Sequence, residues 1–116
     1  MSAWPQPWRV EVSGSGRSGW IRYQEAAGTL SLYWELGGAT SFGEDRSGED
    51  GLRAESVAVI WGEAAAGWDA RHPWAAGRRR AILERIAGEV IRQKAPSCHA
   101  RIEEPQGFIH LRRAGG

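Results

Sequence analysis

The sequence is short of cysteine and of long apolar runs. Its 116 residues include one cysteine, Cys98, so no disulfide can form within the chain, which fits a reducing compartment. No segment approaches the roughly 20 apolar residues that a membrane-spanning helix needs. The first residues lack the basic start and apolar run of a signal peptide. We therefore expect a cytoplasmic protein with no membrane partner.

An excess of one charge is also missing. The formal net charge is +1, which gives no global argument for nucleic acid or for a membrane surface. Lys94 is the only lysine among the fifteen basic residues, and alanine and glycine are abundant. GC-rich coding produces this bias, so we expect a bacterial source. The length and an ordinary hydrophobic share of 41% predict a single domain over residues 1–116.

The signatures of catalysis and of metal binding are absent as well. The sequence contains no G-x-S-x-G, no H-E-x-x-H and no phosphate-binding glycine loop. Cys98 and His99 are adjacent, so in a strand they point to opposite faces, and the paired close spacing of zinc ligands is not present. We therefore assign no catalytic residue, no cofactor and no metal ligand.

One long helix is what the sequence does contain, over residues 76–94. Its apolar residues form one continuous arc at 100° per residue: Ile82, Leu83, Ile86, Ala87 and Val90. Pro73 fits the first position of this helix, and Pro96 predicts that it ends near Ala95. The arc needs an apolar surface to cover.

Period-two alternation supplies that surface. It predicts strands at residues 8–12, 20–25, 29–36, 56–61, 98–103 and 108–112. The segment 29–36 is the clearest, with Leu30, Leu32, Trp34 and Leu36 directed to the core. Short connections favour antiparallel pairing. We predict an α+β fold: a single antiparallel sheet of about six strands, with the helix packed on one face, in the order β-β-β-β-α-β-β.

Two segments are expected to lack regular structure. Residues 37–55 are rich in glycine and acidic residues and have few apolar anchors, which predicts a mobile loop. Residues 113–116 are expected to form a frayed tail.

Seven tryptophans are unusual for a chain of this size. Trp8, Trp34 and Trp61 fall on the apolar faces of predicted strands, where large rings fill a small core. Trp20 falls on the face opposite Ile21, so one of the two sets is exposed. Trp68 and Trp74, just before the helix, either close one end of the core or present an aromatic patch. The candidate partner-binding aromatic residues are Trp20, Trp68 and Trp74.

The arginines of the helix are the strongest charge feature. Arg78, Arg85 and Arg92 recur every seven residues and so line up opposite the apolar arc. Glu84 follows Arg80 by four residues, and Glu89 follows Arg85 by four, which are spacings for ion pairs within a helix. Such a face is either self-paired in water or able to contact phosphates. The candidate basic residues are Arg78, Arg80, Arg85 and Arg92.

The leading hypothesis is a small non-enzymatic domain that binds another protein or a second copy of itself. The first alternative is nucleic-acid binding through the arginine-rich face of the helix at 76–94. The second is a small-molecule site or an enzyme, with its pocket between the sheet and the 68–74 segment.

Overall fold

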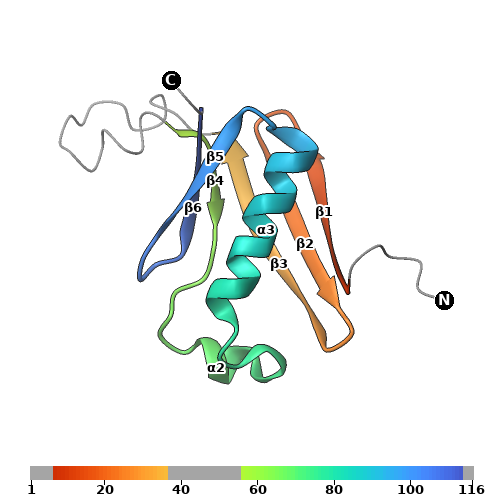
Figure 1. Cartoon of the computed structure of the whole chain (residues 1–116), viewed down its shortest axis with the longest axis vertical. Helices are drawn as coiled ribbons and strands as arrows, with labels where there is room; N and C mark the ends of the chain where they lie inside the picture. The colour runs from red at the N-terminus through yellow and green to blue at the C-terminus, as the bar shows by residue number, and fades with distance from the viewer. Residues whose placement is uncertain (1–6, 37–55, 114–116) are drawn as a thin grey trace.

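The computed structural model describes residues 7–36 and 56–113, which form one antiparallel sheet with one long helix across it (Figure 1). The strands are β1 (Trp8–Ser15), β2 (Ser18–Glu25), β3 (Gly28–Leu36), β4 (Ser56–Trp61), β5 (Cys98–Glu103) and β6 (Phe108–Arg113). The helical segments are α2 (Trp68–Arg71), the 3-10 turn η1 (Pro73–Ala75) and α3 (Arg79–Lys94). The strand order in the sheet is β1-β2-β3-β4-β6-β5. The α+β fold and the predicted order of elements are confirmed.

The glycine-rich stretch over residues 13–19, between two of the predicted strands, is itself mostly strand, since β1 extends to Ser15 and β2 begins at Ser18. Gly14 and Gly19 pair across the hairpin. A Cβ on Gly19 would collide with the carbonyl of Ser13, so these glycines allow a close approach of two backbones. The turn itself is confined to Gly16, with φ of 69°, and Arg17.

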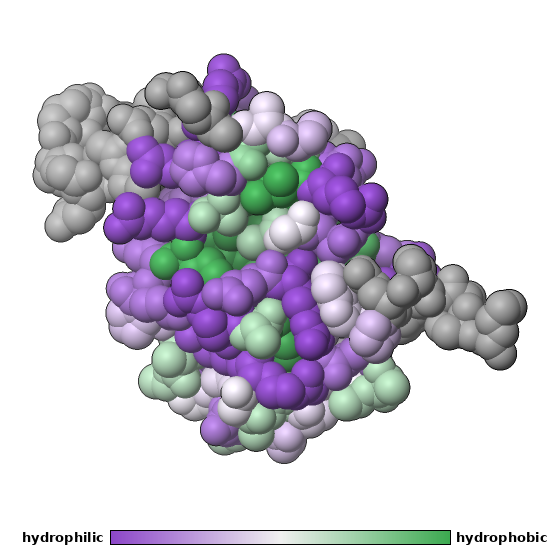
Figure 2. All heavy atoms as spheres, viewed as in Figure 1, coloured by the Kyte–Doolittle hydropathy of each residue, from purple (hydrophilic) through white to green (hydrophobic). Residues whose placement is uncertain are grey.

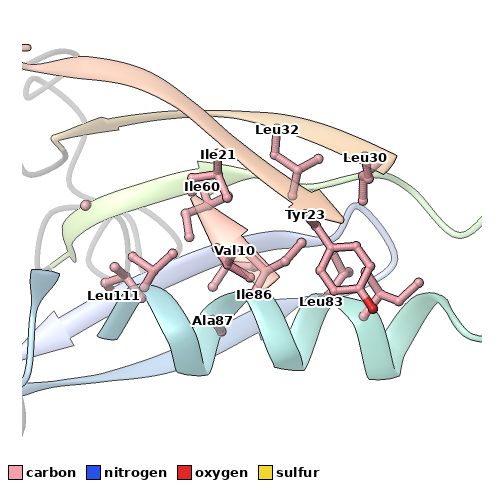
Figure 3. Close-up of a cluster of buried hydrophobic side chains, with 14 of the residues drawn as sticks. Val10, Ile21, Tyr23, Leu30, Leu32, Ile60, Leu83, Ile86, Ala87 and Leu111 are labelled. Carbon is pink, nitrogen blue, oxygen red and sulfur yellow. The ribbon is translucent and has the colours of Figure 1, made fainter. Parts of the chain in front are cut away.

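The core lies between α3 and one face of the sheet (Figure 3). Ile82, Leu83 and Ile86 of α3 are completely buried, and Val90 is nearly so, as the helical periodicity predicts. The sheet contributes Val10, Ile21, Tyr23, Leu30, Leu32, Ile60, Ile109 and Leu111. β4 lies inside the sheet between β3 and β6, which fits its uninterrupted apolar sequence.

Leu36 is an exception to the predicted core. Its side chain is exposed, because the last residue of β3 lies at the rim of a pocket beside the end of α3 and not beneath the helix.

The predicted start of the long helix is wrong. Pro73 begins the short turn η1, and Gly77, with φ of 75°, separates this turn from α3. A residue in the left-handed region cannot continue a right-handed helix, so α3 starts only at Arg79. Its end is as predicted, with Ala95 as the C-terminal cap.

The predicted loop at residues 37–55 lies outside the described residues, as do residues 114–116. The prediction that Arg113 belongs to a frayed tail is wrong, because Arg113 is the last residue of β6 and pairs with Cys98 of β5. Within the described ranges, no helix is long and apolar enough to cross a bilayer.

Candidate functional site

The three candidate tryptophans do not lie on one surface. Trp20 is exposed on the face of the sheet opposite α3, whereas Trp68 is only 2% exposed. The indole N–H of Trp68 donates to the carbonyl of Ala75 at 2.9 Å, so this ring closes the end of the core next to α2. Trp74 is partly buried, with its ring 6.5 Å from that of Tyr23 and directly above Gly28. Trp68 and Trp74 therefore pack against the protein itself.

Arg78 and Arg85 of the candidate basic face turn toward the sheet. Arg78 donates two hydrogen bonds to Glu25 of β2, at 2.9 and 3.1 Å. Arg85 donates to the hydroxyl of Tyr23 at 2.7 Å and lies 5.4 Å from the ring centre of Trp8. The sequence had placed the Arg85 partner on the helix itself, at Glu89. The sheet offers a stronger one, because Tyr23 and Glu25 are partly shielded from water.

These contacts shift two ionisation equilibria. Burial raises the pKa of the Tyr23 hydroxyl, and its hydrogen bond to Glu25 adds to this effect. Burial also acts to raise the pKa of Glu25, but hydrogen bonds from Arg78 and Tyr23 and the two positive charges outweigh it. The pKa of Glu25 therefore lies below its usual value.

The other arginines of the helix also have carboxylate partners. Arg80 pairs with Glu84 at 3.0 Å, as predicted, and with Glu104 at the same distance. Arg92 pairs with Glu89 at 2.7 Å. Hydrogen bonds from Arg79, and then from Arg80, hold the pKa of Glu104 below its usual value against the effect of burial. This pairing of charges weakens the argument for phosphate contacts along α3.

The opposite face of the sheet carries an arrangement that the sequence alone does not predict. Trp20, Tyr33, Trp61 and Phe108 lie side by side on the neighbouring strands β2, β3, β4 and β6, and we call them the aromatic row. Trp20 is paired with Tyr33, and Tyr33 with Trp61. Successive ring centres are 5.6, 6.4 and 5.1 Å apart, with ring planes inclined by 68°, 56° and 64°. These are the edge-to-face contacts that aromatic rings prefer.

The row is accessible to solvent. Trp20 is 56% exposed and Trp61 is 43% exposed, while Tyr33 and Phe108 are half-buried. The prediction that Trp61 fills the core is wrong. In the apolar run of β4 the buried residues are Ala58 and Ile60, and alternation then places Trp61 on the outer face.

The alternation of residues along β3 and β6 is enough to place two members of this row on the outer face. Tyr33 alternates with Leu32 and Trp34, and Phe108 alternates with Ile109, so both belong to the face opposite the core. The run 56–61 has no polar residue after Ser56, so its sequence does not show which residues face the core. The face of the sheet on which Trp61 lies depends on how β4 pairs with its neighbouring strands.

Charges of both signs flank the row. Arg22 follows Trp20 by two residues and Glu35 follows Tyr33 by two, so the antiparallel register places them on opposite sides of the row. On β5, Glu103 lies beside Phe108, and its carboxylate is 2.8 Å from the imidazole of the buried His110. The outer face therefore has an aromatic centre and a mixed polar rim.

The region of the second alternative is a shallow hollow of about 350 Å³ next to α2. Asp69 lines it but already accepts a hydrogen bond from the Gly77 N–H at 3.0 Å. His72 nearby is engaged with Glu63 at 2.9 Å. Among the described residues, no group of three or more histidine, cysteine or acidic side chains is placed to hold a metal ion.

The aromatic row is therefore the most developed surface of the described structure, with large rings at the centre and polar groups around them. Comparison with protein-family models, with curated proteins and with solved structures finds no match for this chain.

Proposed function

We propose that this chain is a non-enzymatic interaction domain that self-associates through the aromatic row, with the open sheet face of one copy packed on that of a second. The observation that carries the proposal is the row itself. Four rings stand next to one another on a sheet face that no described helix covers, and two of them are tryptophans about half exposed.

The composition of the row supports a protein partner. Tryptophan and tyrosine are enriched among the residues that carry most of the binding energy at protein interfaces. The edge-to-face contacts already hold the rings in place, so little side-chain freedom remains to be lost on association.

The size of the face is also suitable. Adjacent strands lie about 4.8 Å apart, so the six strands span about 24 Å. Over strands of about 20 Å, the face covers on the order of 500 Å² in projection, near the scale of the roughly 800 Å² per partner of a standard interface. Face-to-face packing of sheets buries such a surface at a spacing of about 10 Å.

The charges beside the row are arranged for a symmetric pair. If a two-fold axis along the row relates the two copies, Arg22 of one copy faces the side of the row that carries Glu35 in the other copy. The two residues are then one strand apart. The same operation makes the reciprocal pair, so two equivalent ion pairs form.

The mixed rim favours protein over nucleic acid. Arg22 and Arg101 lie on the outer face, but Glu35 and Glu103 lie there too. Nucleic-acid sites present an excess of cations along the path of the phosphates.

Sedimentation equilibrium over a concentration series tests the proposal. The wild-type chain is expected to dimerise, and Trp20→Ala and Trp61→Ala to shift it to monomer without loss of folding. Arg92→Ala, on the opposite side of the molecule, is the matched control and should leave the dimer intact. A wild-type chain that stays monomeric near millimolar concentration at every salt concentration contradicts the proposal.

Charge reversal tests the arrangement. Arg22→Glu and Glu35→Arg should each weaken the dimer, and the double variant should restore it. Filter binding of single-stranded DNA at low salt gives a separate outcome. Salt-sensitive retention that disappears in Trp20→Ala would replace self-association by nucleic-acid stacking.

A further inference from the structure

A second candidate site lies on the helix side of the sheet, away from the aromatic row. It is an apolar pocket of about 270 Å³ between the last turn of α3 and the ends of several strands. Its walls include Val12, Ile21, Trp34, Ile60, Val90 and Leu111. Figure 3 shows Ile21, Ile60 and Leu111 pointing from the sheet to the helix, toward its C-terminal end. Figure 2 shows apolar atoms reaching the surface on this side of the molecule.

The pocket arises from a mismatch in length. Val90 is the last buried residue of the apolar arc, and α3 ends at Lys94. In the last turn, the amide of Gln93 donates to the Val10 carbonyl at 3.0 Å, whereas β1 continues from Val10 to Ser15 and β3 continues to Leu36. Gly14 and Gly16 complete the wall without side chains that would fill the space. The sheet therefore presents apolar residues that the helix no longer reaches.

The chemistry of the walls restricts what can bind. The indole N–H of Trp34 is already used, since it donates to the Ser13 carbonyl at 2.9 Å. The charged group that lines the pocket is the ammonium of Lys94, which is exposed. An occupant thus needs an apolar body and one anionic end.

Lys94 also determines that the polar end of the ligand carries a negative charge. The last carbonyls of α3 carry partial negative charge and disfavour an anion near the C-terminus of the helix. The ammonium of Lys94 offsets this charge and donates to a carboxylate. Without Lys94, a neutral alcohol would be the better head group.

The volume sets the length of the apolar body. The pocket exceeds the roughly 150 Å³ of an engineered apolar cavity that binds benzene. It has room for about nine groups the size of a water molecule. We propose that this pocket binds a medium-chain aliphatic carboxylate of about eight carbons, with the chain among the apolar walls and the carboxylate at Lys94.

Isothermal titration of the full chain with hexanoate, octanoate and octanol tests this assignment. Octanoate should bind about 15-fold more tightly than hexanoate, since each buried methylene contributes about fourfold. Lys94→Met should weaken octanoate severalfold and leave octanol within twofold. Val12→Phe, which fills the pocket from a half-buried position, should abolish binding of both; its folding is checked by circular dichroism.

Trp20→Ala serves as the matched control, because it removes a ring of the aromatic row and should bind octanoate like the wild type. The proposed ligand site and the proposed dimer can therefore be contradicted independently of each other. No saturable binding of octanoate, or equal affinity of hexanoate and octanoate, overturns the site. Unchanged octanoate affinity in Lys94→Met overturns the carboxylate.

Discussion

Arg78 holds both carboxylate oxygens of Glu25, a residue 53 positions earlier in the chain, with hydrogen bonds of 2.9 and 3.1 Å. The same guanidinium donates to the Trp74 carbonyl at 3.1 Å. One side chain thus joins the end of β2, the turn η1 and the start of α3. This contact fixes the N-terminal end of the helix over the sheet.

Arg78→Ala is expected to lower the free energy of unfolding by about 1–2 kcal/mol, because it leaves a shielded carboxylate without its bidentate partner. Arg92→Ala is the matched control on the same helix. Its side chain is 69% exposed, so loss of its pair with Glu89 should change the free energy of unfolding much less than loss of Arg78 does. Urea denaturation at neutral pH compares the two, and equal losses would contradict the role of Arg78.

Stability should fall with acid. The pKa values of Glu25 and Glu104 lie below the usual value of 4.5, so the unfolded chain binds protons more readily than the folded chain. Their contribution is complete above pH 4.5 and is lost as the pH falls through the folded pKa values. Urea titrations between pH 7 and pH 3 should show this decline. The double variant Glu25→Gln with Glu104→Gln should have a shallower slope.

The same substitution should destabilise the protein at Trp68 and have almost no effect at Trp20. Trp68→Phe removes a buried hydrogen bond to Ala75 and part of a buried ring, with an expected loss of about 1–3 kcal/mol. Trp20→Phe, at an exposed position, should change stability by less than about 0.5 kcal/mol. Thermal unfolding at low protein concentration measures both changes. A neutral Trp68→Phe would show that this ring does not close the core.

Two glycines make a second matched pair. A Cβ on Gly28 would collide with the ring of Trp74, so Gly28→Ala should destabilise the fold by about 1–3 kcal/mol. Gly88 lies on the exposed side of α3, where a Cβ meets nothing within 4 Å. Gly88→Ala should therefore stabilise the protein by about 0.5–1 kcal/mol. Denaturation midpoints of the two variants, expected on opposite sides of the wild type, provide the check.

Local pattern was a reliable guide wherever one residue type alternated with another. Leu30 and Leu32 on one strand, and Ile82 and Ile86 on the helix, are buried as their spacing predicts. The pattern was a poor guide in an all-apolar run, where it does not show which residues face the core. It was also a poor guide at a glycine, which can either continue a helix or end it. Trp61 ends an all-apolar run, and Gly77 interrupts a segment that otherwise reads as helix.

The sequence by itself determined the element types, their order and the apolar arc of α3, because these depend on the period of side chains along one segment. Tertiary structure decided which side chains from distant segments lie next to one another. The aromatic row exists only because the pairing of β2, β3, β4 and β6 brings four separate rings to one level of the sheet. The partners of Arg78 and Arg85 likewise come from a distant strand, so no spacing within the helix could reveal them.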